Sequence, residues 1–154
     1  MIVHAVTPAD ALAVACHRYP NEFDTGEREI YVTWVAGATE RGLYLGFVAL
    51  DVEEVVAGAG LTLLEWGPSR GDSQPWRARV VNVWMPPDWR RRGLGRDLVT
   101  RCLQVAGQRG VTRVGLGTSA EARALYEGLG LWADGSDMRL SLCGPGLPVT
   151  FSDR

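Results

Sequence analysis

The feature that most constrains the fold is the stretch from residue 79 to residue 101, RVVNVWMPPDWRRRGLGRDLVTR. It starts as an apolar run typical of a strand, turns at two prolines, and ends in a helical pattern. Gly93 and Gly95 stand where the loop becomes the helix, so the backbone is accessible and the first helical amides lack intrahelical partners. Such a helix N-terminus binds anions, and four neighbouring arginines add positive charge. The stretch therefore predicts a site for a phosphate chain.

Other nucleotide-binding patterns fit this stretch poorly. A Walker A loop requires a lysine, whereas all 16 basic residues of this chain are arginines. A dinucleotide fingerprint requires a third glycine, which is missing both from GLGRDL at 93–98 and from GLG at 115–117. A solvated arginine run before an ordinary helix is the structural alternative. The strand and the paired prolines that precede the run weigh against it.

Length and charge limit the class of protein. We expect one domain over residues 1–154, because this length supports a single substantial core. A net charge of -2 argues against a general nucleic-acid or membrane-surface binder. No apolar run approaches the roughly 20 residues of a membrane span, and the N-terminus lacks the charged start of a signal peptide. We therefore expect a cytoplasmic protein.

The cysteines and histidines do not form a metal-binding pattern. Cys16, Cys102 and Cys143 are widely spaced, and no CxxC motif is present. His4 and His17 are each isolated in the sequence. We therefore expect no zinc site, no other metal site and no disulfide framework.

Periodicity and turn residues predict the order of the elements. Helices are expected from Pro8 to just before Pro20, around Ile30 and Trp34 up to Gly42, over 96–108, and from Ser119 to Gly128 or Gly130. Strands are expected over 2–6, 43–51, 55–66, 79–85, 111–117, 131–133 and 138–142. Gly58 and Gly60 indicate a bulge or a close backbone approach, 67–75 is expected to be a loop, and the tail over 143–154 is expected to be irregular or packed across the surface. This order predicts a mixed α/β layer with antiparallel hairpins first and a parallel crossover later.

Two segments resemble one family. MPPDWRRRGLGR at 85–96 resembles motif A of the GNAT acyltransferase superfamily, and SAEARALYEGLGL at 119–131 resembles its motif B. The resemblance covers roughly residues 77–142. It implies a single-domain α/β (α+β) GNAT-like fold, in which about four helices flank a central, mixed but mostly antiparallel sheet of six to seven strands.

The resemblance also implies how acetyl-CoA would bind. The strand before motif A would pair with the pantetheine arm, the amides from Arg91 to Arg96 would hold the pyrophosphate, and the helix at Ser119 would line the other side. Tyr126 would protonate the departing thiolate as the general acid. The implied cofactor-binding residues are Val83, Trp84, Met85, Arg91, Arg92, Gly93, Leu94, Gly95, Arg96 and Ser119.

The chain departs from the family pattern at several positions. Ser119 replaces a common Asn, and Leu131 replaces a common Phe. Neither 80–85 nor 111–117 carries a carboxylate, although many members place a general base there. The alternatives for the general base are therefore a water molecule in the site, Asp24 or Glu27, or no base other than the solvent. Asn82 is expected to make a structural hydrogen bond or to orient a water.

The resulting hypothesis is an acetyl-CoA-dependent N-acetyltransferase that transfers its acyl group directly to an amine, with coenzyme A as the leaving group. The alternatives are a non-catalytic acyl-CoA-binding or regulatory module and, more remotely, nucleic-acid binding by the arginine cluster. The acceptor, a small molecule or a peptide, is open: acidic residues between 22 and 29 suggest a cationic one or simply favour a helix N-terminus. Trp34, Trp66 or Trp84 would shape its pocket. Dimers are common in the superfamily, so a homodimer is compatible with the resemblance.

Overall fold

The computed structural model describes residues 1–142, and the expected tail with Cys143 lies outside them. The strands are β1 (Ile2–Ala5), β2 (Tyr44–Asp51), β3 (Glu54–Glu65), β4 (Trp76–Trp84) and β5 (Val114–Gly115). The helices are α1 (Ala11–Arg18), α2 (Thr25–Glu40), α3 (Leu94–Gln108) and α4 (Arg123–Gly128). Short 3-10 turns occupy Pro8–Asp10, Glu22–Asp24 and Pro87–Trp89.

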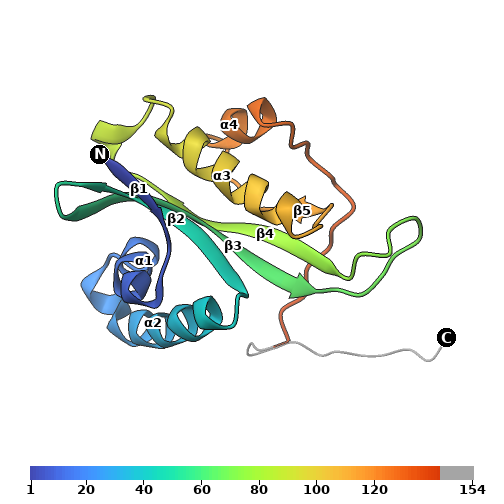
Figure 1. The fold of residues 1–154 in the computed structure, drawn as a ribbon, viewed down its shortest axis with the longest axis horizontal. Helices are drawn as coiled ribbons and strands as arrows, with labels where there is room; N and C mark the ends of the chain where they lie inside the picture. The colour runs from blue at the N-terminus through green and yellow to red at the C-terminus, as the bar shows by residue number, and fades with distance from the viewer. Residues whose placement is uncertain (143–154) are drawn as a thin grey trace.

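The five strands form one sheet in the order β1-β2-β3-β4-β5. The first four are antiparallel to their neighbours, and β5 is parallel to β4. Helices α1 and α2 cover one face of the sheet, and α3 and α4 cover the other (Figure 1). The expected antiparallel hairpins followed by a parallel crossover are confirmed.

Each helical layer has its own core against the sheet. On α3, Leu98, Val99, Cys102 and Ala106 are at most 1% exposed, because their spacing places them on one helical face. They pack with alternate residues of β3 and β4. The second core, beneath α1 and α2, is smaller and includes fully buried Val35 and Tyr44.

Local signals set where the first helical segment begins. The Thr7 amide donates to the Asp10 carboxylate at 2.8 Å, and Pro8 occupies the first turn. This is the predicted capping arrangement, although the first turn is a 3-10 helix that continues into α1. The structure thus confirms this start at the predicted residues.

A register shift lies at the predicted bulge between β3 and β4. Gly58 is opposite Trp84, and Gly60 is opposite Val81, so β4 carries one more residue than β3 over this interval. The φ of Asn82 is +55°, in the left-handed region that a non-glycine residue seldom adopts. The extra residue of the bulge is therefore in β4, whereas the glycines belong to the regular strand opposite.

The prediction of six to seven strands is wrong for the described part of the chain. Only two residues of the expected 111–117 strand pair with β4, and 131–133 and 138–142 form no strand. The β5 edge is too short to align a further strand beside it. The side chains of Trp132 and Met138 are 81% and 96% exposed, so this segment lacks the packing that would hold it in a sheet.

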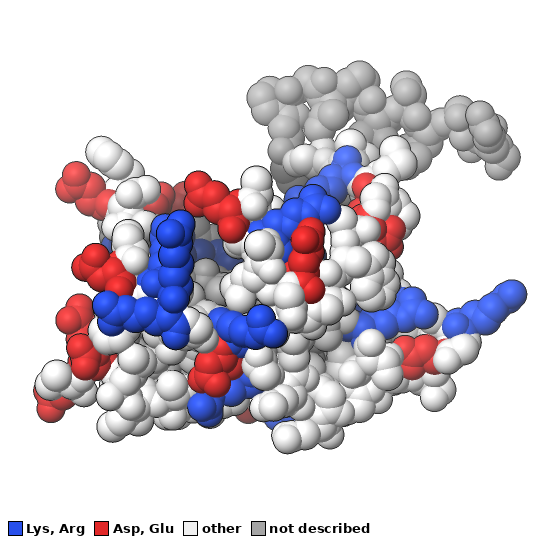
Figure 2. All heavy atoms as spheres, turned by 90° about the horizontal axis from the view of Figure 1, so that it is seen from above, with Lys and Arg blue, Asp and Glu red and all other residues white. Residues whose placement is uncertain are grey.

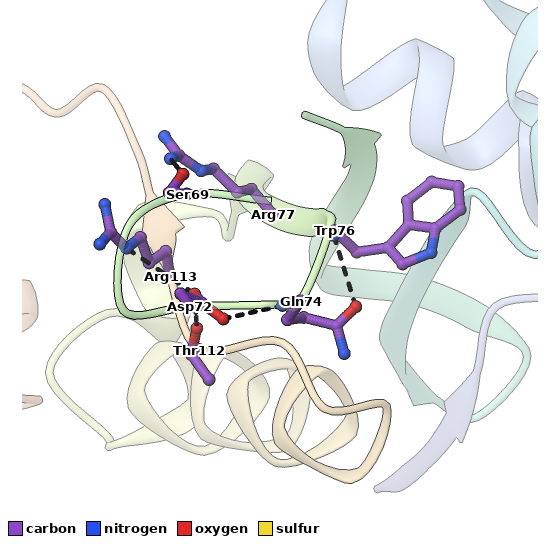
Figure 3. Close-up of polar contacts among 7 residues, drawn as sticks. All are labelled: Ser69, Asp72, Gln74, Trp76, Arg77, Thr112 and Arg113. Atoms are coloured by element: carbon purple, nitrogen blue, oxygen red, sulfur yellow. Dashed lines mark hydrogen bonds and ion pairs between the residues drawn. The ribbon is translucent and has the colours of Figure 1, made fainter. Parts of the chain in front are cut away.

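The loop before β4 is anchored to the segment that leads into β5 (Figure 3). The Asp72 carboxylate accepts hydrogen bonds from the Thr112 hydroxyl and from the Gln74 amide, and it lies 3.9 Å from the Arg113 guanidinium. At the other side of the loop, Arg77 donates to the Ser69 hydroxyl at 3.0 Å. These contacts determine where β5 starts relative to β4.

None of the helices within residues 1–142 is long and apolar enough to cross a membrane. In the same residues, His, Cys, Asp and Glu side chains do not gather in groups of three or more that could hold a metal ion.

Candidate active site

The centre of the site is the edge of β4 that faces β5. The parallel ladder joins only Ala78 to Val114 and Arg79 to Gly115, so the two strands have no further pairing beyond Arg79. Residues 80–84 of β4 consequently present an edge without a strand neighbour on that side. Free backbone donors and acceptors on such an edge can pair with an extended ligand.

A cavity of about 270 Å³ opens beside this edge. Four parts of the chain line it: α1, the second half of β4, the segment after β5, and α4. The lining residues are His17, Arg18, Val80, Val81, Asn82, Val83, Trp84, Gly117 and Tyr126. The structure thus brings together three of the predicted site residues, Val83, Trp84 and Tyr126.

Tyr126 is the predicted general acid and faces this cavity from α4. Its side chain is largely covered, since the residue is only 7% exposed. Burial raises the pKa of its phenol above the ordinary value of about 10. The phenol therefore keeps its proton at neutral pH.

The N-terminus of α3 provides the backbone donors that the sequence predicts. The first hydrogen bond of the helix runs from the Asp97 amide to the Gly93 carbonyl at 3.0 Å, and no side chain caps this end. The four amides from Gly93 to Arg96 thus lack intrahelical partners. The φ of Gly93 is +77°, which turns the chain into the helix and is accessible to glycine without strain.

The two glycines of this loop have different surroundings. No atom lies within 4 Å of where a Cβ on Gly93 would be, so this position is open to a ligand. A Cβ on Gly95 would lie 2.4 Å from Cε of Met85, and Gly95 is buried. Gly95 therefore allows Met85 to pack under the start of α3, and only its amide remains for a ligand.

The arginines of the predicted site differ in their contacts. Arg91 is exposed and has a φ of +62°, and the Arg92 guanidinium lies over the Trp89 ring at 5.3 Å. Arg96 donates to the Gly128 carbonyl at 3.2 Å and so joins α3 to the end of α4. On the face that carries α3 and α4, acidic side chains lie among the arginines (Figure 2). Such a mixed surface does not favour a nucleic-acid backbone.

Ser119 lies outside the cavity lining, because α4 begins later than the sequence predicts. The helix starts at Arg123, and the exposed Ser119 hydroxyl accepts a hydrogen bond from the Ala122 amide at 3.3 Å. This contact stabilises the turn that leads into α4. The predicted helix start at Ser119 is therefore four residues too early.

His17 is a cavity residue that the sequence does not predict. Its ring stacks on Trp84 with the centroids 3.7 Å apart and an interplanar angle of 20°. Burial lowers its pKa to about 4, so the imidazole is neutral at pH 7. His17 and Trp84 are far apart in the sequence, and an isolated histidine carries no signal for such a contact.

Arg18 and Asn82 form a second cluster on the α1 side of the cavity. Nη1 of Arg18 donates to Oδ1 of Asn82 at 2.9 Å, and Nδ2 of Asn82 donates to the Tyr31 and Tyr44 hydroxyls at 2.8 and 3.1 Å. The Arg18 guanidinium also lies 4.9 Å from the centre of the Tyr31 ring. Asn82 thus makes the structural hydrogen bonds expected of it, and it joins α1, α2, β2 and β4.

The two carboxylates named as alternatives to a water or solvent base do not line the cavity. Asp24 and Glu27 do not line it, and in the described part of the chain no lining residue is acidic. Among the three tryptophans proposed for an acceptor pocket, Trp84 lines the cavity, whereas Trp34 stacks on Tyr31 and Trp66 lies beneath Arg77.

The sequence model of the acetyltransferase (GNAT) family matches residues 10–131. This range includes α1, strands β2 to β5 of the sheet, the glycine turn before α3 and Tyr126 on α4. No curated protein sequence matches the chain.

Several solved structures share the fold. A predicted acetyltransferase with acetyl-CoA from Clostridium acetobutylicum has a TM-score of 0.83 at 16% identity, covering 92% of this chain and 96% of that chain. A GCN5-related N-acetyltransferase from Ralstonia eutropha JMP134 has a TM-score of 0.82 at 23% identity, with 93% and 99% covered. An aminoglycoside acetyltransferase from an uncultured soil metagenomic sample has a TM-score of 0.64 at 18% identity, with 92% and 98% covered.

At these identities the solved structures show a common fold. The family match goes further, because it spans most of the chain and both sides of the cavity. The protein therefore belongs to the acetyltransferase (GNAT) family, whose general chemistry is acetyl transfer from an acyl-coenzyme A.

Proposed function

We propose that this protein is an acetyl-CoA-dependent N-acetyltransferase that transfers the acetyl group directly to an amine. The observation that carries the proposal is the position of Tyr126. Its protonated hydroxyl shares one cavity with the unpaired edge of β4. An extended thioester held on this edge would have a proton donor beside its sulfur.

The backbone groups of the site suit the parts of acetyl-CoA. The free amides from Gly93 to Arg96 and the positive end of α3 suit the pyrophosphate. Residues 83–85 of β4 suit the amide-containing pantetheine arm, which can pair with a strand edge. The structure from C. acetobutylicum, which shares the fold and contains acetyl-CoA, supports acetyl-CoA as the ligand.

The reaction forms a C–N bond, breaks a C–S bond, removes a proton from the amine and gives a proton to the thiolate. The amine nitrogen attacks the thioester carbonyl, and a backbone N–H of β4 stabilises the resulting oxyanion. The carbonyl C=O then re-forms from the oxyanion as the C–S bond breaks, and the Tyr126 hydroxyl protonates the thiolate. The ammonium proton leaves to water or to neutral His17, and Tyr126 regains its proton from solvent.

His17 is the protein group best suited to accept that proton. It is neutral at pH 7 and lines the cavity on the α1 side. Its lowered pKa makes it a weak base, so it would pass this proton on to solvent rather than hold it. Asp24 and Glu27 do not line the cavity, so we do not assign this role to them.

One observation favours a second candidate, an acyl-CoA-binding module without activity. The cavity has no carboxylate in the described residues that could act as a strong base. Such a module would bind acetyl-CoA and release no coenzyme A with any amine.

Two measurements test the proposal. Calorimetry should detect binding of acetyl-CoA and coenzyme A, with pantetheine at least about ten-fold weaker because it lacks the phosphate contacts. A thiol-release assay over a broad amine panel should then detect turnover. Tight binding without thiol release would identify the non-catalytic module, and no binding would reject both functions.

A further inference from the structure

We propose that the acceptor is a small amine that carries a carboxylate near its amino group, as an amino acid does, and that Arg18 binds this carboxylate. The inference rests on the proposed acetyl transfer and concerns the α1 side of the same cavity. It differs from the cationic acceptor that the acidic residues between 22 and 29 suggest in the sequence.

The first argument is the charge of the cavity. Arg18 is the only lining residue that is charged at pH 7 within the described part of the chain, since His17 is neutral there. No described acidic side chain lines the cavity. A polycationic acceptor would meet repulsion from Arg18 with no compensating carboxylate. An anionic group on the acceptor would be attracted to the Arg18 guanidinium.

The second argument is that the Arg18 charge is held in place but not neutralised. Its hydrogen-bond partners are neutral: the Asn82 side-chain oxygen at 2.9 Å and the Tyr19 hydroxyl at 3.3 Å. No ion pair joins Arg18 to a carboxylate among residues 1–142. A guanidinium has five N–H donors in a planar fork, so donors remain for a carboxylate.

The third argument is that the anchor of Arg18 is built into the β4 bulge. Asn82 adopts its unusual φ of +55° at the bulge, and its amide group is held by the buried Tyr44 and by Tyr31. Backbone strain of this kind persists where surrounding contacts enforce it. The same stretch of β4 includes the edge proposed to hold the thioester. Arg18 is therefore positioned relative to the acyl group by one rigid element.

Neighbouring aromatic rings reinforce this arrangement. The Arg18 guanidinium lies over Tyr31 at 4.9 Å, and Tyr31 in turn stacks with Trp34 at 5.7 Å between centroids. Stacking restricts a guanidinium to one plane and lowers the entropy that it loses on binding a ligand.

The experiment compares matched acceptors in a thiol-release assay with the full chain and saturating acetyl-CoA. Each α-amino acid is paired with its decarboxylated amine and with its neutral amide. The amino acids should have kcat/KM values about 10- to 100-fold above those of the matched amines, as expected for a charge-assisted hydrogen-bonded pair. Equal or better turnover of the amines would overturn the inference.

Substitutions of Arg18 test whether this residue causes the preference for amino acids. Arg18→Gln should lower kcat/KM for the amino acids about 10- to 100-fold, mainly through KM, and leave the amines within about two-fold. Arg18→Lys should restore part of the preference because it keeps the charge. Arg101→Gln, an exposed position on α3, is the control and should change neither substrate class. Circular dichroism checks that each variant is folded, and an unchanged amino-acid preference in folded Arg18→Gln would reject the assignment.

The outcomes separate this inference from the proposed function. If the protein acetylates amines but does not prefer those with a carboxylate, the proposed acetyl transfer is supported and the role of Arg18 is rejected. Acetyl-CoA binding without any thiol release removes the proposed enzyme itself, and the acceptor assignment falls with it.

Discussion

The two sides of the cavity are built in different ways. The side proposed for acetyl-CoA uses backbone groups from one short stretch, the end of β4 and the start of α3. The side proposed for the acceptor uses the side chains of His17, Arg18 and Asn82, which come from distant parts of the sequence. A backbone site tolerates changes of side chain, whereas a side-chain cluster loses its function with a single substitution. We therefore expect the donor side to be common to many relatives and the acceptor side to be particular to this chain.

Tyr126 lies between the two sides, and its substitution should have the largest effect. Tyr126→Phe should lower kcat about 100-fold, because it removes the proposed acid and keeps the ring. Calorimetry should show acetyl-CoA affinity within about two-fold of the parent, since the proposed phosphate contacts remain. Trp132→Phe, at an exposed position, serves as the control. Unchanged kcat in Tyr126→Phe would remove this residue from the mechanism.

Asn82 tests the acceptor side alone. Asn82→Ala should destabilise the protein by about 1–3 kcal/mol, because the buried Tyr44 hydroxyl loses its partner and Arg18 loses its anchor. Acceptor KM should rise while acetyl-CoA affinity is retained. Asn82→Gly removes the same side chain but tolerates a φ of +55°, so the difference between the two variants in urea unfolding measures the backbone strain. A glycine variant less stable than the alanine variant by about 0.5–1 kcal/mol, the entropic cost of glycine, would show that the bulge is unstrained.

The contribution of His17, on the acceptor side, to the free energy of unfolding should depend on pH. Its pKa is about 4 in the fold and near 6.5 in the unfolded chain, so the unfolded chain binds more protons between these values. The His17 contribution is complete above pH 6.5 and is lost as the pH falls toward 4. Allowing for partial exposure, the loss should be roughly 1–2 kcal/mol. Urea unfolding of the parent and of His17→Gln across this range measures it, and parallel pH profiles for the two proteins would contradict the assignment.

Gly93 tests the donor side. Gly93→Ala forces alanine into a φ of +77°, at a cost of about 1–2 kcal/mol, and should weaken acetyl-CoA binding while leaving acceptor KM unchanged. Gly107→Ala is the matched control, because Gly107 lies in the same helix with open space beside it and should be neutral or slightly stabilising. A rise in acceptor KM for Gly93→Ala would show that the two sides are not independent.

The sequence predicts most of the elements because their signals are local. Apolar spacing identifies the buried face of α3, and Thr7 with Asp10 identifies the start of the first helical segment. The predicted strands at 131–133 and 138–142 are absent because apolar residues alone do not provide a partner strand. A strand forms only where a neighbouring edge is available, and β5 offers two residues.

The free backbone groups of the proposed donor side are predictable from the sequence, because a strand, a proline turn and a glycine at a helix start follow one another in consecutive residues. The side chains of the proposed acceptor side come together only in the folded protein. The packing of α1 against β4 brings His17 onto Trp84 and Arg18 onto Asn82. The physical reason is that side-chain contacts between distant segments depend on how the layers pack, and no local pattern encodes them. The same packing places an uncompensated arginine in the cavity and leaves the acidic residues of 22–29 out of its lining.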